Sequence, residues 1–291
     1  MNATAVARAM TAAPHRHHGL LALPVLIALV LLYAPAYLEL AGGLWQTDAQ
    51  AHAPLVGIVS FVLLWRSLIR SASLPDGPWS ALAFLGLIPG LLLAYVGLTQ
   101  SLHLLTFASQ PLVLGGGIAW LYGYARLRAA WFPLLFLLFM VPLPGFFIDS
   151  ITGDLKAWIS LMVEELLYAA GYPIARSGVM LTIGQYQLLV ADACSGLHSM
   201  ISLSALGTLY VWLVKPRRPA HTLVLLASVL PIAFAANLAR VLALVLLTYH
   251  QGDAVARAFH DALGVSVFIV ALLLLIGLDI ALATLNREQH A

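Results

Sequence analysis

Long apolar runs separated by short polar stretches repeat along the 291-residue chain. A helix needs about 20 apolar residues to cross the hydrocarbon core of a bilayer, and each run comes close to that length or exceeds it. The pattern predicts an all-α polytopic membrane protein, with eight transmembrane helices in one integral membrane domain over residues 1–291. The predicted spans lie near 20–40, 53–70, 79–99, 103–125, 130–148, 197–214, 221–248 and 264–285.

The composition supports a membrane protein. Hydrophobic residues make up 62% of the chain and charged residues only 9%, whereas a soluble domain carries about 25% charged residues. The mean hydropathy of +0.96 excludes a soluble globular domain, and it also excludes disorder, which requires low hydrophobicity. The formal net charge of +2 is small and its charges are scattered, so we expect no nucleic-acid partner.

The basic residues give the predicted helices an orientation. Ten of the 14 lysines and arginines fall on one side, which the positive-inside rule assigns to the cytoplasm together with both termini. The long polar break at 149–196 is then extracytoplasmic. A small-residue stretch near Ala34 resembles a signal-peptidase site, but the apolar run continues beyond it, so we expect an uncleaved first span.

The first part of the extracytoplasmic loop has the pattern of an interfacial helix. Residues Asp154–Tyr172 place apolar side chains along one helical stripe, and we expect Glu164 and Glu165 on the wet face. Gly171 and Pro173 are helix-stop signals. The predicted stripe contains Leu155, Trp158, Met162, Leu166 and Tyr168.

A β-hairpin is predicted next, before the sixth span. Val179–Ile183 and Tyr186–Val190 are two short β-prone runs on either side of a turn that contains Gly184. The chain then passes through Asp192–Gly196 directly into the sixth span.

Cys194 is the only cysteine, so no intramolecular disulfide exists. It stands at the outer mouth of the sixth span, next to Asp192, Ser195 and Gly196. Helix N-termini stabilise thiolates, and their free N–H groups stabilise an oxyanion. The position favours a nucleophile, and the alternative is a small buried hydrophobe, as most free cysteines are.

Arg240 lies inside the otherwise apolar seventh span. A charged side chain there costs about 2.5–3.5 kcal/mol on insertion scales, so we expect it to face protein. Asn237 is one turn earlier on the same face. Ala233 and Ala236 would allow a neighbouring helix to approach closely. The alternative role for Arg240 is a structural ion pair or a snorkelling side chain.

His260 precedes the eighth span on the same predicted side as Cys194 and Arg240. A thiol, a base and a guanidinium are the groups that acyl transfer through a thioester requires. A rival base is His198, four residues after Cys194, and spacing on a helix alone favours it. The alternative for His260 is an exposed loop histidine.

Three ordered motifs carry a resemblance. Ala193–Gly196 (Ala-Cys-Ser-Gly), Asn237–Val241 (Asn-Leu-Ala-Arg-Val) and Phe259-His260 resemble, in order and spacing, the exosortase/archaeosortase family of polytopic membrane cysteine transpeptidases. The resemblance covers most of the chain. The run from Leu181 to Gly207 is most similar to the exosortase B branch.

The resemblance implies a role for each motif residue. Cys194 would be the nucleophile, His260 the general base, and Arg240 the residue that stabilises the oxyanion or orients the substrate. Arg176 is a candidate partner for a glutamate of the substrate. The supporting or substrate-binding candidates are Asp192, Ser195, Gly196, Asn237 and Arg176.

The same resemblance implies the substrates and the location. The expected partners are exported proteins anchored in the membrane, whose C-terminal signal (PEP-CTERM) joins a Pro-Glu-Pro motif, a transmembrane helix and a basic tail. The expected place is the bacterial inner membrane, with the active site on the periplasmic side and a link to exopolysaccharide production. Transfer to an acceptor and simple hydrolysis both remain open. We expect no cofactor, because neither a metal-ligand cluster nor a nucleotide-binding glycine motif occurs.

Two other classes of protein remain as alternatives, a small transporter or lipid-linked sugar flippase and a non-catalytic scaffold. A buried arginine suits an anion path. Transporters, however, often show internal repeats and several midplane polar residues, whereas this chain has no repeat and offers only Asn237 and Arg240. Substitution of Cys194 separates the classes, because only an enzyme depends on the thiol.

Overall fold

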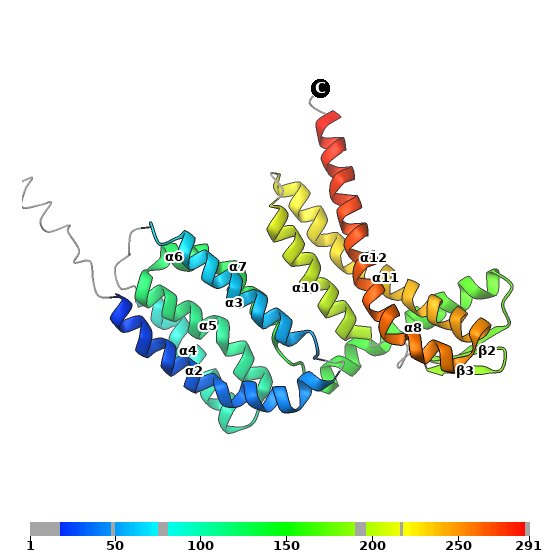
Figure 1. The fold of residues 1–291 in the computed structure, drawn as a ribbon, viewed down its shortest axis with the longest axis horizontal. Helices are drawn as coiled ribbons and strands as arrows, with labels where there is room; N and C mark the ends of the chain where they lie inside the picture. The colour runs from blue at the N-terminus through cyan, green and yellow to red at the C-terminus, as the bar shows by residue number, and fades with distance from the viewer. Residues whose placement is uncertain (1–17, 48–49, 75–80, 190–195, 216–217, 289–291) are drawn as a thin grey trace, which may run out of the picture. The chain divides into compact units, whose positions relative to one another are not determined.

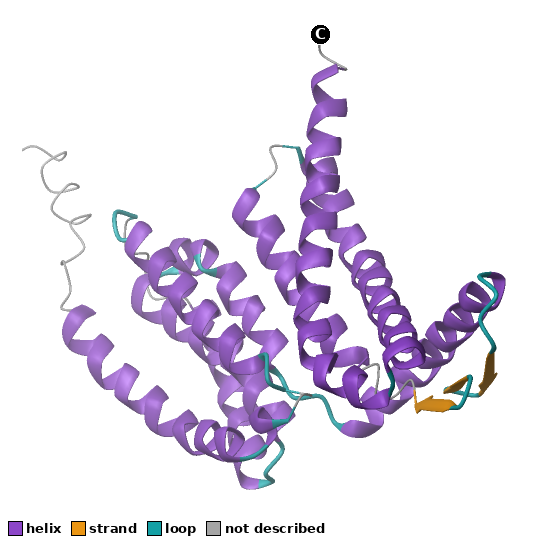
Figure 2. Cartoon of the chain, turned by 45° about the vertical axis from the view of Figure 1, so that its right-hand side comes forward, coloured by secondary structure: helices purple, strands orange, loops and turns teal. Residues whose placement is uncertain are grey.

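The computed structural model describes residues 18–47, 50–74, 81–189, 196–215 and 218–288 (Figure 1). Helices dominate this part of the chain, and one small antiparallel sheet accompanies them (Figure 2). The predicted all-α polytopic membrane fold is confirmed. The helices are α2 (His18–Gly42), η1 (Leu44–Gln46), α3 (Ala53–Arg70), α4 (Ala81–Thr99), α5 (His103–Tyr122), α6 (Tyr124–Ala129), α7 (Trp131–Phe136), η2 (Leu137–Met140), α8 (Gly145–Ala169), α10 (Gly196–Val214), α11 (Pro219–Gln251) and α12 (Asp253–Glu288).

An apolar helix lies at each predicted span. Among the described residues, five helical segments are long and apolar enough to cross a membrane. They are Ala22–Gln46, Ala53–Arg70, His103–Tyr122, Pro219–Gln251 and Ala262–Thr284. Shorter apolar helices lie at the third, fifth and sixth predicted spans, namely Ala83–Thr99, Trp131–Met140 and Met200–Val214. The total of eight spans stays a prediction.

The chain, predicted as one membrane domain, packs as two compact units. The first comprises the described residues of Met1–Gly43 and Gly57–Val141, and the second those of Leu44–Val56 and Pro142–Ala291. The composition gave no sign of this division, because both units are built from the same kind of apolar helix.

Close contact between α4 and α5 organises the first unit. A Cβ atom on Gly90 would lie 2.8 Å from Val113 Cγ2, and one on Gly116 would lie 2.7 Å from Leu87 Cγ. Small residues let the two backbones approach, which drives helix association in a bilayer, where apolar burial between helices gains little.

The helix at the fifth predicted span ends earlier than expected. η2 stops at Met140, whereas the apolar pattern continues to residue 148. Pro142 and Pro144 explain the difference, because the residue before a proline is biased away from the helical region. Val141 is accordingly extended, with ψ of 119°. α8 begins at Gly145, well before the predicted start of the interfacial helix at Asp154.

The predicted hairpin is confirmed, and a third strand extends it. β2 (Met180–Ile183) pairs antiparallel with β3 (Tyr186–Leu189), and β1 (Ile174–Ser177) pairs with the other edge of β2. Both two-residue turns begin with a glycine of positive φ, 64° at Gly178 and 56° at Gly184. Glycine at this place suits the type II′ turn, which matches the twist of paired strands.

The sheet packs against α8 and the last turns of α11. The alternation along each strand directs one face inward, so that the sheet and the two helices share one apolar core. Its fully buried members are Ile159 and Val163 of α8, Leu181 and Ile183 of β2, and Val241 and Val245 of α11.

α8 carries two apolar stripes, of which the sequence indicated only one. Trp158 and Leu166, from the predicted stripe, are 62% and 50% exposed, as a helix lying in an interface requires. The second stripe contains Ile159 and Val163 and faces the protein. The predicted stop at Gly171 is confirmed, since this residue has a φ of 84° in a Schellman-type C-cap.

α10, α11 and α12 lie side by side and form the apolar body of the second unit (Figure 1). Ala233 and Ala236 of α11 lie in a buried cluster with Leu203 of α10 and Val267 of α12. Both alanines are thus buried where α11 meets its neighbours, and the close approach that they would allow stays a prediction.

Asp279 of α12 contacts both other helices, near the C-terminal end of α10 and the N-terminal end of α11. The Tyr210 hydroxyl donates to its Oδ2 at 2.8 Å, and His221 Nε2 lies 2.8 Å from its Oδ1. The three residues come from α12, α10 and α11 respectively, so one carboxylate accepts a hydrogen bond from α10 and contacts a histidine of α11.

Replacing Asp279 with alanine is expected to destabilise the protein by about 1–3 kcal/mol, because the Tyr210 hydroxyl loses its acceptor and His221 loses the carboxylate beside it. Thermal unfolding of the full chain in detergent measures this change. Thr284→Ala, an exposed position on the same helix, is the matched control. Equal midpoints for the two variants would contradict a stabilising role for Asp279.

Candidate active site

Arg240 is buried in the second unit although it carries a charge. Its exposed fraction is 6%, and Asn237, one turn earlier on α11, is fully buried. The prediction that both face protein is confirmed. A Cβ atom on Gly264 would lie 3.4 Å from Arg240 Nη2 and 3.8 Å from its Cζ. The guanidinium therefore lies next to α12 at Gly264, at van der Waals distance from where a Cβ atom would stand.

His260 belongs to a helix and not to a connecting loop. α11 ends at Gln251, Gly252 turns the chain with φ of 86°, and α12 begins at once at Asp253. Position 260 is thus one helical turn before Gly264, on the same face of α12. This is the face against which the guanidinium of Arg240 lies.

The first residue of α10 is level with Arg240. α10 and α11 pack antiparallel, and a Cβ atom on Gly207 would lie 2.8 Å from Val229. Both helices rise about 1.5 Å per residue, so equal steps back from Gly207 to Gly196 and forward from Val229 lead to Arg240. Gly196, Arg240 and Gly264 therefore share a level to within about one turn, ~5 Å.

Three predicted site residues, Asp192, Cys194 and Ser195, lie outside the described residues. The described chain stops at Leu189, the end of β3, and resumes at Gly196, the start of α10. The segment with the predicted nucleophile thus connects the sheet to the level of Arg240.

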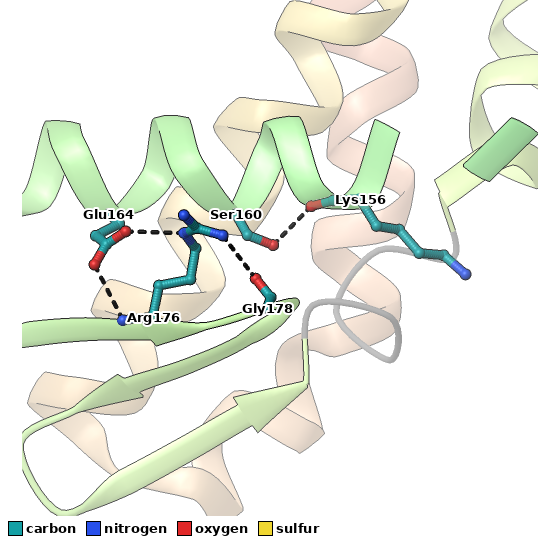
Figure 3. A network of polar contacts seen from close by, with 5 residues as sticks. All are labelled: Lys156, Ser160, Glu164, Arg176 and Gly178. Atoms are coloured by element: carbon teal, nitrogen blue, oxygen red, sulfur yellow. Dashed lines mark hydrogen bonds and ion pairs between the residues drawn. The ribbon is translucent and has the colours of Figure 1, made fainter. Parts of the chain in front are cut away.

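Arg176 has a partner within its own unit. Its Nε donates to Glu164 Oε2 at 2.9 Å, its backbone N donates to Glu164 Oε1 at 3.1 Å, and its Nη1 donates to the Gly178 carbonyl at 3.1 Å (Figure 3). Nearby on α8, Ser160 Oγ donates to the Lys156 carbonyl at 2.6 Å (Figure 3).

This ion pair corrects one expectation, that for Glu164. Glu164 faces the sheet and not the wet side, whereas its neighbour Glu165 is exposed as predicted. Arg176 pairs with the Glu164 carboxylate of α8 and fastens β1 to that helix. The sequence did not indicate this pair, because β1 itself was not predicted. The role of Arg176 as a partner for a glutamate of the substrate stays a prediction.

An aromatic cluster ties the sheet region to the end of α11. Tyr172 and Tyr249 meet edge to face at 5.4 Å between ring centroids, and the Tyr172 hydroxyl lies 3.3 Å from His250 Nε2. A Cβ atom on Gly184 would lie 3.3 Å from the Tyr249 ring. The β2–β3 turn is therefore held where α11 ends, just beyond the turns that carry Arg240.

The arrangement suits a reaction that develops negative charge. A buried guanidinium and the first N–H groups of α10 lie at one level, and both stabilise an anion. Sequence reasoning missed that Gly264, one turn after His260, lies next to Arg240. Within the ranges described, no three His, Cys, Asp or Glu side chains gather to hold a metal ion.

Removing the Glu164 carboxylate is expected to lower the free energy of unfolding by about 1 kcal/mol. The charge-assisted bonds favour a larger effect, but solvent screens them, since both side chains are 28% exposed. Glu164→Ala and the exposed neighbour Glu165→Ala form a matched pair for thermal unfolding. A loss in both variants, or in neither, would mean that the ion pair does not hold β1.

Comparison with known proteins gives one match. A family model described as transmembrane exosortase matches residues 45–277. No curated protein and no solved structure matches the chain. The matched region contains α10, α11 and most of α12, and with them the predicted Cys194, Arg240 and His260. Because the match covers most of its length, the chain belongs to the transmembrane exosortase family.

Proposed function

We propose that the chain is a membrane cysteine peptidase or transpeptidase, similar to exosortase B, that cleaves the C-terminal sorting signal of PEP-CTERM proteins. The observation that carries this proposal is the buried guanidinium of Arg240, packed on Gly264 and level with the start of α10. A charge buried in an apolar bundle is costly. The positive charge has a function when an oxyanion forms beside it, because it stabilises that oxyanion.

The proposed reaction runs through a thioester. His260 takes the proton of Cys194, and the thiolate attacks the scissile carbonyl carbon, whose electron pair moves to oxygen. Arg240 and the N–H groups at the start of α10, including that of Gly196, stabilise this oxyanion. The C–N bond then breaks, and His260 gives its proton to the leaving amine. An acceptor nucleophile or water finally attacks the thioester, passes its proton to His260 and releases the thiolate.

Supporting roles go to the polar neighbours of these groups. Asn237 is fully buried one turn from Arg240 and would restrict the conformations of the guanidinium. Asp192 and Ser195 flank the thiol in the sequence and would orient it or the substrate backbone.

The sheet offers a track for an extended signal peptide. β3 is an edge strand of the described sheet, and its chain continues directly toward Cys194. A peptide that adds to β3 by backbone hydrogen bonds would be led to the thiol. The distribution of basic residues supports a periplasmic site at the inner membrane, beside the transmembrane anchor of the substrate. A link to exopolysaccharide export is part of this proposal.

Processing of a tagged protein with a Pro-Glu-Pro sorting tail tests the proposed residues. Cys194→Ala is expected to abolish the mass shift, His260→Ala to slow it by about 10²–10⁴-fold, and Arg240→Ala by about 10²–10³-fold. His198→Ala, the rival histidine, is the matched control and should retain processing. Survival of processing in Cys194→Ala would exclude the thioester. Loss of processing in His198→Ala, with processing retained in His260→Ala, would identify His198 and not His260 as the base.

Gly264→Leu is expected to slow processing by about 10–100-fold, since a displacement of ~1 Å in a catalytic group has effects of that order. Its side chain would occupy the space of the Arg240 guanidinium. Gly277→Leu on the same helix is the control, because a Cβ atom there has no neighbour within 4 Å. The single-turnover rate should fall only in the first variant. Equal rates would show that the contact with α12 does not position Arg240.

A further inference from the structure

The two edges of the small sheet differ in what lies against them. β1 forms one edge and β3 the other. At the β1 edge, the Arg176 backbone N donates to Glu164 Oε1 at 3.1 Å, so a side chain of α8 occupies the outward backbone donor (Figure 3). A further strand can therefore add to this sheet only at the β3 edge.

The pairing register determines which backbone groups of β3 face outward. Ile183 and Tyr186 flank the two-residue turn and pair directly, so they exchange backbone hydrogen bonds. Bonded and non-bonded pairs alternate along an antiparallel ladder. Tyr186 and Leu188 therefore bond to β2, whereas the N–H and C=O groups of Gln187 and Leu189 face the open edge. Within the described ranges, nothing bonds to these outward groups.

An independent contact agrees with this alternation. Ser177 and Met180 flank the β1–β2 turn, so the backbone of Arg176 is expected to face away from β2. The bond from its N–H to Glu164 lies on that outward side. The same alternation directs the backbone of Gln187 outward, and this residue is exposed.

β3 runs from the outer end of α11 toward the proposed site. A Cβ atom on Gly184, in the turn before β3, would lie 3.3 Å from the ring of Tyr249, near the end of α11. After β3 the described chain resumes at Gly196, which is level with Arg240, about 14 Å before Tyr249 along α11. The end of α11 is predicted to be extracytoplasmic. A substrate chain that passes from its exported part to its membrane anchor runs in the same direction as β3.

We propose that the sorting signal adds to β3 as a parallel fourth strand, with the glutamate of its Pro-Glu-Pro motif bonded to the Gln187 C=O and the Leu189 N–H. In a parallel pair, a residue that faces its neighbour bonds to two residues that are two positions apart. The glutamate then lies beside Leu188, and both prolines face away from β3. This inference rests on the proposed function and adds an orientation and a register to it.

The spacing of the prolines suits an edge strand. Proline has no backbone N–H, and within sheets it occurs on edge strands with that position turned to solvent. A segment with proline at every second position can therefore pair along one side only. The residue between two prolines keeps its N–H on that side, which is where β3 presents the Gln187 C=O. The outward prolines also prevent a further strand from adding.

N-methylated sorting signals test the register. Synthetic signals that include the membrane helix are processed by the wild-type chain in detergent. N-methylation of the glutamate is expected to lower kcat/KM about tenfold, because one hydrogen bond is lost and the methyl group meets β3. At each proline position, alanine and N-methylalanine are the matched comparison and should give equal rates. Equal rates with methylated and unmethylated glutamate would overturn the register.

A backbone change in β3 tests the same contact from the side of the protein. Gln187→Pro removes an N–H that faces the open edge and leaves the bonds to β2 in place. Its kcat/KM is expected to lie about two- to tenfold below that of Gln187→Ala, which keeps the N–H. Thermal unfolding of both variants checks the fold. Equal kcat/KM in two folded variants would contradict pairing at Gln187.

Disulfide cross-linking tests the orientation without turnover. Cys194→Ala removes the only cysteine, and Gln185→Cys then places one thiol in the exposed turn before β3. Signals carry a single cysteine three residues before or three residues after the glutamate and are oxidised with copper–phenanthroline. The cysteine before the glutamate should cross-link more strongly, because a parallel strand brings it beside position 185. Ala175→Cys, exposed on β1, is the control and should cross-link with neither signal.

The outcomes separate this inference from the proposed function. Preferential cross-linking of the cysteine after the glutamate would overturn the parallel orientation. Cross-linking at position 185 no stronger than at position 175 would overturn binding to β3. Processing of the unmodified signal by the wild type, together with either result, would leave the proposed function standing. Absence of that processing would contradict the proposed function, while cross-linking would still decide how the signal binds.

Discussion

The buried guanidinium of Arg240 constrains how the apolar helices around it can pack. The charge of Arg240 loses its hydration when α11 packs, and the surrounding protein must supply what water no longer provides. Small residues stand around the charge, because Ala233 and Ala236 are buried between the helices and Gly264 lies next to the guanidinium. A side chain much larger than a methyl group at position 264 would compete with the guanidinium for this space.

The common level of the proposed site groups follows from helix geometry. Neighbouring antiparallel helices with equal rise keep a constant register, so a contact at Gly207 and Val229 determines which residues meet several turns away. The short connection at Gly252 makes α12 start immediately after α11. Gly196, Arg240 and Gly264, which are distant in the sequence, are thereby brought to one level by helix register.

The sequence was informative wherever a residue acts through its own local chemistry. Apolar runs predicted the helices, Gly184 predicted the hairpin turn, and the charge of Arg240 predicted its burial against protein. The sequence was uninformative where the structure of one segment depends on its contacts with another segment. Ile159 and Val163 form a second stripe on α8 that has meaning only once the sheet exists.

The failures share one physical origin. β1 is short, and three of its four residues are polar or small, so nothing in its own pattern marks it as a strand. It forms because it pairs with β2. The Arg176–Glu164 pair depends on β1 and was therefore invisible too. α8 starts early because Pro142 and Pro144 interrupt an apolar run that hydropathy alone treats as continuous.

α11 is much longer than a bilayer requires, and this has a mechanical consequence. Its 33 residues extend about 50 Å, whereas the hydrocarbon core is about 30 Å thick. The last turns of the helix pack against the sheet through Val241 and Val245. One part of α11 therefore lies in lipid, and the other part is fixed to the rest of the protein. A helix adapts to a thinner bilayer by tilting. Such a tilt would move the sheet and α8 together with α11. Membrane thickness would then determine how far the sheet stands from the lipid surface.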